Sequence, residues 1–507
     1  MSIRHSAGAF RHLSISGAYR EISLAGLFED RQFHVCLIAA MSLLVLFAKL
    51  HLGDLGGYDD AVYAHEGKRM LATGEWWTVY LNGQPDFDKP PMFIWLEALS
   101  MKVFGVSDFA ARLPSSLLGF GSILLVYFIT RELTTSYWLP VWAMMILFCT
   151  QFFMRYAMRA MTDVPFTFFF ELALLFYLIG LRRNRYFILC GAAIGFAVLT
   201  RSFIGLIPLG IILGHLTISG RWDAGRAKYL IAGTLLALGL PLVWFVSQYQ
   251  LHGSKFLALH FSFTFDNLPL TNGKGADQFG SGLLRYPLFL IKSYWPWLPL
   301  MVVGMWSQTK KAIKERDSTG LFLTLWVLAL IVPFSLAEFK WLRYIMPAFP
   351  AFAILSAVPL NDWITAHWRR LFLKAAYAVL CLTMVGMSLN PKYRDRPEEM
   401  RRLAPVAESA TIPERKILLY IERLHPYAHM YQIIWYADRY CELLANANEA
   451  LAKLEREPNA AVIMDKDVFL TSIICEAAAS DQTITILGQT ERFICWTIDH
   501  QHHSEEK

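Results

Sequence analysis

The stretch PMFIWLEALSMKVF, residues 91–104, decides the topology that we predict for this chain. It is apolar enough to resemble a membrane span, but a spanning helix needs about 20 mostly apolar residues and this stretch is shorter. Glu97 and Lys102 also interrupt it, and charged groups are expensive at that depth in a bilayer. Because prolines begin it, and proline is tolerated at a helix N-terminus, we predict an interfacial amphipathic helix here and not a span.

The composition around this stretch is that of a polytopic membrane protein. Of the 507 residues, 55% are hydrophobic and only 17% are charged, which is less charge than a soluble domain carries. The stretches that reach or approach the length of a span are 34–52, 113–129, 140–153, 164–181, 186–199, 204–218, 230–246, 287–306, 321–336, 344–360 and 371–389. We therefore predict an α-helical polytopic membrane protein with about eleven transmembrane helices, and up to about thirteen if borderline stretches also cross.

The distribution of basic residues predicts the orientation. Lysines and arginines gather in short loops at 182–185, 221–228, 310–316 and 369–370. The positive-inside rule places such loops in the cytoplasm, so the net charge of +6 indicates orientation and not nucleic-acid binding. If residues 1–32 form a cytoplasmic N-terminal leader and eleven spans follow, every one of these basic loops lies in the cytoplasm, as the rule requires. The outer segments are then 52–112, 154–163, 200–203, 250–286, 337–343 and the residues after 389.

Residues 391–507 differ in composition and contain no apolar span. We predict strands at 417–420, 432–436, 461–464, 484–487 and 492–498, alternating with helical stretches such as 446–455. This pattern is typical of a small soluble α/β domain, which the predicted topology places outside the cytoplasm. The seven cysteines show no zinc-site spacing, and the sequence does not decide whether Cys475 and Cys495 form a disulfide.

The first outer loop, residues 52–112, holds the most informative polar residues, because acidic residues lie there among glycines, tryptophans and prolines beside the membrane. We predict a helix over 61–71 with Asp59 or Asp60 as its N-cap. A carboxylate of this pair could draw a proton from an acceptor hydroxyl, or it could bind a cation. Lys89, between Asp88 and two prolines, suits a phosphate group; the alternative is an ordinary Asp–Lys surface pair.

Further charged residues lie on the outer side of the predicted topology. The basic ones, which the insertion rule disfavours there, are Arg155, Arg159, Arg201, Lys340 and Arg343. At bilayer depth such charges need an anionic partner, and a phosphorylated lipid headgroup would be one. Asp163 is either a helix cap or a functional carboxylate at the mouth of a span. His260 is either structural or part of a lid formed by the loop 250–286.

Several short motifs carry a resemblance. They are Asp59-Asp60, Tyr63-Ala64, residues 70–76, Asp88-Lys89-Pro90, residues 104–105 and 111–114, Thr162-Asp163, residues 199–201, and Lys340 followed by residues 343–347. In these motifs the sequence resembles the membrane glycosyltransferases of the C-type fold, in the group of protein O-mannosyltransferases and lipid A aminoarabinose transferases (glycosyltransferase families 39 and 83). The sequence departs from the aminoarabinose transferases at Val62, where they have an arginine, and at Arg201-Ser202, where they have Lys-Gly. Asp88 also replaces a more usual glutamate.

The resemblance implies a transmembrane glycosyltransferase domain over 33–390. This domain would move a sugar, with inversion, from a polyprenyl-phosphate donor to a lipid, glycan or protein acceptor outside the inner membrane of a bacterium, as in lipopolysaccharide and cell-envelope modification. The implied catalytic residues are Asp59, Asp60 and Asp163, and the implied donor-phosphate ligands are Lys89, Arg201, Lys340, Arg343 and Tyr344. No cofactor is required, but a carboxylate–histidine pair that holds a divalent metal (zinc, magnesium or manganese) in some relatives maps to Asp88 and His260. Membrane lipids are the other expected partners, and nucleic acid is not.

A second hypothesis from another class is a transporter or flippase of a lipid-linked saccharide. It explains the spans and the outer basic residues equally well. It does not explain the long acidic first loop or the outer domain, and transporters more often show internal repeats and charges at the midplane. The sequence contains no Walker loop, which argues against an ATP-driven pump. The sugar, the acceptor and the oligomeric state are not decided by the sequence.

Overall fold

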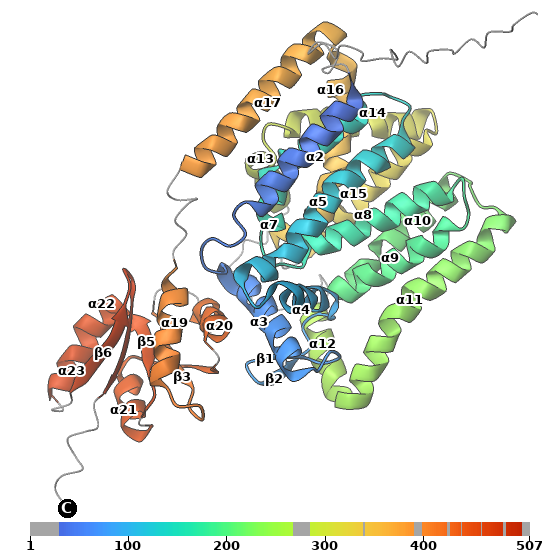
Figure 1. Cartoon of the computed structure of the whole chain (residues 1–507). Helices are drawn as coiled ribbons and strands as arrows, with labels where there is room; N and C mark the ends of the chain where they lie inside the picture. The colour runs from blue at the N-terminus through green and yellow to red at the C-terminus, as the bar shows by residue number, and fades with distance from the viewer. Residues whose placement is uncertain are drawn as a thin grey trace, which may run out of the picture.

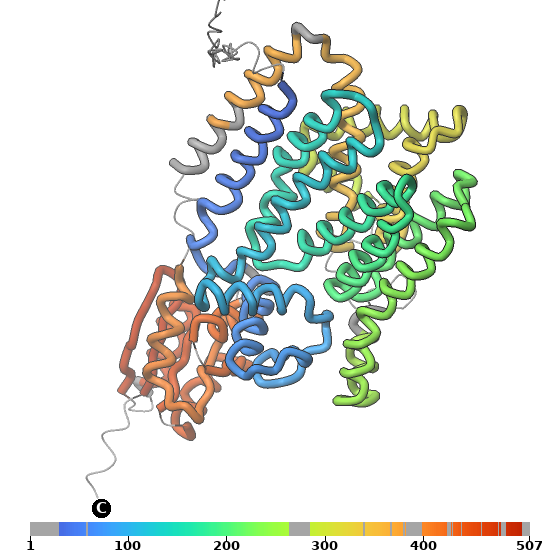
Figure 2. Tube along the Cα trace, turned by 45° about the vertical axis from the view of Figure 1, so that its right-hand side comes forward, coloured from blue at the N-terminus to red at the C-terminus, as the bar shows by residue number. Residues whose placement is uncertain are grey.

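The computed structural model describes residues 30–266, 284–337, 340–389, 398–422, 426–437, 439–457, 459–479 and 483–498. A helical domain occupies the chain up to residue 389, and a smaller domain built on a β-sheet follows from residue 398 (Figure 1). Both views place the smaller domain at one end of the helical domain, beside helix α3 (Gly57–Thr73) (Figure 2). The loop that precedes the second long apolar helix therefore lies between the two domains.

Mostly apolar helices of different lengths form the helical domain. They are α2 (Arg31–Phe47), α5 (Asp108–Leu133), α6 (Leu139–Phe148), α7 (Gln151–Ala157), α8 (Asp163–Gly180), α9 (Tyr186–Arg201), α10 (Ile207–Ile218), α11 (Ala224–His252), α13 (Arg285–Ser293), α14 (Leu298–Lys314), α15 (Ser318–Leu336), α16 (Phe349–Trp363) and α17 (Ala366–Leu389). Each predicted apolar stretch lies on one or two of these helices. Side chains of α5, α6, α8, α15 and α16 build the largest apolar core.

Six helical runs in the described part of the chain are long and apolar enough to cross a membrane, or seven if the bent pair α6 and α7 is one span. The axes of that pair differ by 64°, and α2 is a shorter apolar helix of 17 residues. These helices confirm a multi-span helical membrane protein. The predicted number of eleven crossings stays a prediction, because it also counts helices below this length.

One of the six runs, Tyr186–Ile218, turns back on itself. Its first half, α9, starts just after the end of α8 and finishes at Arg201, which pairs with Asp163 at the start of α8. Its second half, α10, returns to the other end of α8, where His215 Nδ1 lies 2.5 Å from the hydroxyl of Tyr177. The two halves are thus antiparallel helices, and they correspond to the predicted stretches 186–199 and 204–218.

The first loop folds into helix α3, a two-stranded hairpin and a second short helix, which are followed by α5. The hairpin consists of β1 (Val79–Leu81) and β2 (Gln84–Asp86), and the second short helix is α4 (Met92–Phe104). Helix α4 confirms the helix predicted from residues 91–104; its interfacial position stays a prediction. The predicted cap of α3 is wrong, because Gly56 is the N-cap and Asp59 and Asp60 lie inside the first turn. Negative charge is also favourable there, since the helix dipole is positive at its N-terminus.

The C-terminal domain has a five-stranded mixed sheet in the order β4-β3-β5-β7-β6. The strands are β3 (Ile417–Tyr420), β4 (Cys441–Leu443), β5 (Val462–Asp465), β6 (Ile484–Gln489) and β7 (Phe493–Ile498). Strand β3 is parallel to β4 and β5, whereas β7 is antiparallel to β5 and β6. Helices α19 (Glu399–Ala410) and α20 (Pro426–Tyr436) pack on one face, and α21 (Asn448–Arg456) and α23 (Ile474–Ala479) on the other.

The strand predicted at 432–436 is wrong, because these residues form the end of α20. Periodicity does not distinguish a short apolar run in a strand from one in a helix, and here the run packs between the sheet and α3. The other predicted strands are confirmed, whereas β4 was not predicted. Cys441 and Cys495 are free thiols. The side chain of Cys475 lies outside the described residues.

Candidate functional site

Arg343 joins two carboxylates at the end of the helical domain that faces the C-terminal domain. It lies in a short 3-10 helix, η3 (Leu342–Ala348), directly before α16. Its Nη1 atom lies 2.6 Å from Oδ2 of Asp59, and its Nε atom lies 3.9 Å from Oδ1 of Asp163. The guanidinium also stacks on the ring of Trp341 at 4.9 Å. The structure therefore brings the first turn of α3 against the segment before α16.

Asp163 is the second centre of this cluster and is fully buried at the start of α8. Nη2 of Arg201 lies 2.8 Å from Oδ1 of Asp163, and Nε of Arg201 donates to Oγ1 of Thr162 at 3.2 Å. The ring of Tyr344 lies 5.4 Å from the Arg201 guanidinium. The hairpin formed by α8 and α9 makes this possible, because it returns the last residue of α9 to the first residue of α8.

Asp60, the next residue along α3, has a different cationic partner. Nε of Arg159 lies 3.4 Å from Oδ2 of Asp60, and Nη2 of Arg159 donates to the carbonyl oxygen of Gly56 at 3.3 Å. Burial raises the pKa of the Asp60 carboxyl to about 6, although Arg159 opposes this shift. The two adjacent aspartates thus lie in separate ion pairs, one with Arg343 and one with Arg159.

Lys89 lies beside this cluster in a small pocket between α3, β2 and α4. Its Nζ atom lies 2.6 Å from Oδ2 of Asp88 and 5.3 Å from the centre of the Tyr63 ring. Burial lowers the pKa of Lys89, but the nearby carboxylates, Asp88 first and then Asp59, outweigh it and raise that pKa above its usual value. The lysine is therefore cationic at neutral pH. Tyr63, Glu66, Asp86, Asp88, Phe93 and Thr162 also line the pocket.

His260, on α12 (Ser254–Asp266), is buried between two backbone segments of the site. Its Nδ1–H donates to the carbonyl oxygen of Phe87 at 2.6 Å, and its Nε2 accepts from the hydroxyl of Ser202 at 3.0 Å. Burial lowers the pKa of His260, so the ring is neutral at pH 7. A metal-binding histidine commonly donates its other N–H to a carbonyl in this way. However, the described residues contain no group of three metal-binding side chains, so the metal pair of Asp88 and His260 stays a prediction.

Lys340 precedes η3 and is buried. Its Nζ donates to the carbonyl oxygen of Ala337 at 2.6 Å, which ties it to the end of α15. This contact holds the segment that carries Arg343 and Tyr344. A role for Lys340 in binding phosphate stays a prediction.

The structure brings most of the predicted residues into one cluster. The members linked by ion pairs or ring contacts are Asp59, Asp163, Arg201, Arg343 and Tyr344, with Asp60 and Lys89 next to them. Tyr63 and Ser202 were not singled out as site residues by the sequence. Tyr63 could have been found, because it lies one helical turn after Asp59 and Asp60, on the same face of the helix.

Comparisons with known proteins identify the family to which this fold belongs. Residues 88–245 match the family model of dolichyl-phosphate-mannose-protein mannosyltransferases. An uncharacterized protein of Aquifex aeolicus is 30% identical over 360 residues, which cover 70% of each chain. The chain belongs to this family of membrane glycosyltransferases. The resemblance read from the motifs is therefore confirmed, and the matched region of the glycosyltransferase includes Asp88, Lys89, Asp163 and Arg201.

Relatives and solved structures extend the comparison for this glycosyltransferase. A Pseudomonas fluorescens undecaprenyl phosphate-alpha-4-amino-4-deoxy-L-arabinose arabinosyl transferase is 29% identical over 336 residues, covering 64% of this chain and 56% of that protein. Our chain thus spans a little over half of that transferase. ArnT from Cupriavidus metallidurans bound to undecaprenyl phosphate has a TM-score of 0.71 at 20% identity, covering 92% of this chain and 98% of ArnT. The oligosaccharyltransferase AglB from Archaeoglobus fulgidus has a TM-score of 0.58 at 13% identity, covering 86% and 69%. These two likenesses show the C-type fold.

Proposed function

We propose that this glycosyltransferase moves a sugar from a polyprenyl-phosphate donor to an acceptor on the extracytoplasmic side of the bacterial inner membrane, with inversion at the anomeric carbon. The acceptor would be lipid A, another lipid-linked glycan or a protein. The observation that carries the proposal is the cluster in which Asp59 and Asp163 meet Arg201 and Arg343, with Lys89 beside them. It combines a candidate base with several cations at the end of the bundle from which the C-terminal domain extends.

The cations suit the leaving group of this reaction. As the bond between the anomeric carbon and the phosphate oxygen breaks, its electron pair goes to the polyprenyl phosphate, and negative charge grows there. Guanidinium groups bind phosphate oxygens through paired N–H donors, and fixed positive charge at a developing anion is usually the largest contribution to catalysis. Arg201, Arg343 and Lys89 would supply this charge.

Asp59 would take the proton of the acceptor. The acceptor oxygen forms its new bond to the anomeric carbon, and its proton passes to the carboxylate as general base. Asp59 is paired with Arg343 at 2.6 Å, and a donor phosphate would compete for the same N–H groups. Donor binding would thus loosen Asp59 and make it available as a base. If the acceptor is itself a phosphate, no base is needed, and Asp59 would position the sugar.

No step of this mechanism depends on a metal. If a divalent cation binds, Asp88 and His260 would hold it, and its charge would assist in neutralising the phosphate. Asp60 would support Asp59 through its pair with Arg159, which also binds the N-cap carbonyl of α3, and Tyr344 would support Arg201, whose guanidinium lies over its ring.

The test uses the purified full-length protein in lipid nanodiscs with a panel of polyprenyl-phosphate sugars and extracted envelope lipids. We expect one donor to release polyprenyl phosphate, and Asp59→Asn to lower the rate of this release by about 100-fold or more. The matched control is Asp362→Asn, which removes an exposed carboxylate near the end of α16 that lies away from Arg343. Movement of the donor across liposome membranes without sugar transfer would support a flippase and overturn the proposal.

A further inference from the structure

The backbone that leads into the acidic turn of α3 is held by one buried arginine. Arg112, on α5, has 1% of its side chain exposed. Its Nη1 donates to the carbonyl oxygens of Leu50 and Leu52 at 2.7 and 3.0 Å, and its Nη2 donates to those of Gly53 and Asp54 at 3.2 and 2.7 Å. A guanidinium can reach several acceptors at once in a way that lysine cannot. The chain immediately before α3 therefore has a fixed path over the start of α5.

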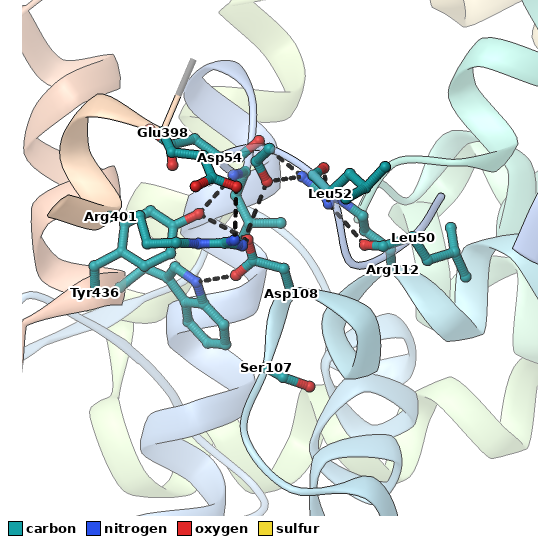
Figure 3. A network of polar contacts seen from close by, with 12 residues as sticks. Leu50, Leu52, Asp54, Ser107, Asp108, Arg112, Glu398, Arg401 and Tyr436 are labelled. Atoms are coloured by element: carbon teal, nitrogen blue, oxygen red, sulfur yellow. Dashed lines mark hydrogen bonds and ion pairs between the residues drawn. The ribbon is translucent and has the colours of Figure 1, made fainter. Parts of the chain in front are cut away.

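The residue one turn before Arg112 on the same helix face contacts the C-terminal domain. Asp108 is buried and accepts from Nε1 of Trp435 at 2.8 Å and from the hydroxyl of Tyr436 at 2.9 Å. It also forms an ion pair with Arg401. Figure 3 shows Asp108 with these partners on one side and Arg112 with its backbone acceptors on the other. Residues four apart on a helix lie on one face, so α5 connects the two sets of contacts.

The C-terminal domain also contacts the leading segment directly. The hydroxyl of Tyr436 accepts from the backbone N–H of Leu55 at 2.8 Å, and Nε2 of Gln432 donates to the carbonyl oxygen of Leu55 at 2.6 Å. Oδ2 of Asp54 accepts from the backbone N–H of Met400 at 3.1 Å (Figure 3). Both backbone groups of Leu55 are thus bound by α20, and Tyr436 bridges Leu55 to Asp108.

Only three residues separate Leu55 from Asp59, and the first of them, Gly56, is the N-cap of α3. The carbonyl of Gly56 accepts from Arg159, which pairs with Asp60. Any displacement of α20 would leave buried polar groups of this network without partners, and such groups are expensive. The position of the acidic turn therefore depends on the docked position of the C-terminal domain.

We propose that the C-terminal domain is a positioning element for the transfer reaction, and that Asp108, Arg401 and Tyr436 act through Leu55 to hold Asp59 in its working position. This inference rests on the proposed function for its effect on rate. Its structural part, the coupling of α20 to the segment 50–56, is independent of that function. A purely structural interface would hold the domain in place without affecting the reaction of a bound donor.

The experiment compares Arg401→Ala, Arg401→Lys and Tyr436→Phe in the full-length protein in nanodiscs. The control is Arg415→Ala, which breaks an ion pair with Glu457, the C-cap of α21, on the face of the sheet opposite α20. We expect Arg401→Ala to lower kcat for transfer by about 10- to 100-fold with little change in KM for the donor, since misplacement of a catalytic group by about 1 Å has an effect of this size. Arg401→Lys should recover part of kcat, and Arg415→Ala should match wild type.

Hydrogen–deuterium exchange gives a readout that needs no activity. We expect faster exchange over residues 50–62 in Arg401→Ala and Tyr436→Phe, with unchanged exchange in the strands of the C-terminal domain. Tyr436→Phe removes a single hydroxyl, so it tests the bridge without unfolding the domain. Unchanged exchange over 50–62 in both variants would overturn the coupling. Changed exchange with wild-type kcat would overturn the positioning role. If the wild-type protein transfers no sugar, the proposed function fails, and the exchange measurement still decides the coupling.

Discussion

The Nη1 atom of Arg343 lies 2.6 Å from Oδ2 of Asp59, so the segment before α16 and the first turn of α3 meet in one ion pair. The same guanidinium reaches toward Asp163 at 3.9 Å. A single cation thus lies between the carboxylate proposed as the base and the carboxylate that anchors Arg201. Changes at Arg343 are expected to affect donor binding and base position together.

The first prediction concerns this coupling. We expect Arg343→Ala to lower kcat/KM by about 100-fold, which is the usual effect of removing one fixed charge from a developing anion. Arg343→Lys should recover little, because an ammonium lacks the paired donors that reach two carboxylates. The double variant with Asp59→Asn should be no worse than Asp59→Asn alone, because residues that act together are not additive. The steady-state rate of polyprenyl phosphate release gives kcat/KM for each single variant and for the double variant.

The control for Arg343 is Arg131→Ala, which removes an exposed arginine from the last turn of α5, at its other end from Asp108. It should retain wild-type kcat/KM. If the losses from Arg343→Ala and Asp59→Asn simply add, the two residues act independently, and the proposed release of Asp59 by the donor is wrong.

The second prediction concerns Lys89. We expect Lys89→Gln to raise KM for the donor and to weaken inhibition by free polyprenyl phosphate by about tenfold, which is the loss of one charge-assisted hydrogen bond. Lys102→Gln is the matched control, because it removes an exposed lysine from the last turn of α4. Product-inhibition constants of polyprenyl phosphate, measured for both variants, decide whether Lys89 contacts the phosphate. Equal inhibition of wild type and Lys89→Gln would exclude a phosphate contact at this lysine.

The basic residues that the predicted topology puts on the outer side show how far the sequence could predict the site. Their unfavourable placement indicated that Arg159, Arg201 and Arg343 need anionic partners, and this is correct. A lipid phosphate was the partner expected from the sequence, whereas the structure pairs these arginines with Asp60, Asp163 and Asp59. Which carboxylate meets which arginine depends on how α8, α9 and η3 pack, and local sequence patterns do not contain that information.

The network around Asp108 was not predicted for a related reason. Asp108 and Arg112 are four residues apart, as on one face of a helix. The sequence alone indicates only that Asp108 lies in the first turn of a helix capped by Ser107. Their partners, Asp54 and Arg401, belong to an irregular segment and to a different domain. Residues 432–436 were predicted as a strand, in which Gln432 and Tyr436 would not both face Leu55 as they do in the structure. They do so because they lie one turn apart on helix α20.

The third prediction concerns stability. Asp163 and Arg201 are 0% and 7% exposed and 2.8 Å apart, and breaking a buried pair by removing one partner costs about 3–5 kcal/mol. We expect Asp163→Ala and Arg201→Ala each to lower the thermal unfolding midpoint by several degrees in detergent. The double variant Asp163→Leu with Arg201→Met should lie closer to wild type, since it leaves no unpaired buried charge. A double variant that is less stable than either single variant would contradict this account.

The fourth prediction concerns pH. Burial raises the pKa of Asp60 from 3.8 to about 6, so the folded protein binds this proton more tightly than the unfolded chain does. The stability from this group is therefore complete below about pH 4 and is lost as the pH rises through about 6. Acidification does not unfold the protein through Asp60. It does neutralise the carboxylate that pairs with Arg159, and Arg159 also binds the N-cap carbonyl of α3.

We therefore expect transfer by the wild-type protein to fall as the pH is lowered from 7.5 to 5, with an apparent pKa near 6 that we assign to Asp60 because of its pair with Arg159. Burial raises the pKa of the Asp54 carboxyl to about 6 as well, so Asp54 is the other group in this range. Asp60→Asn should have a low rate with no such step, because its side chain stays neutral at every pH. Asp362→Asn, at an exposed position, should keep the step. Rates measured under saturating donor, with thermal unfolding followed at each pH, separate loss of charge from loss of fold. If the step near pH 6 persists in Asp60→Asn, another group causes the step, and the charge of Asp60 does not control transfer.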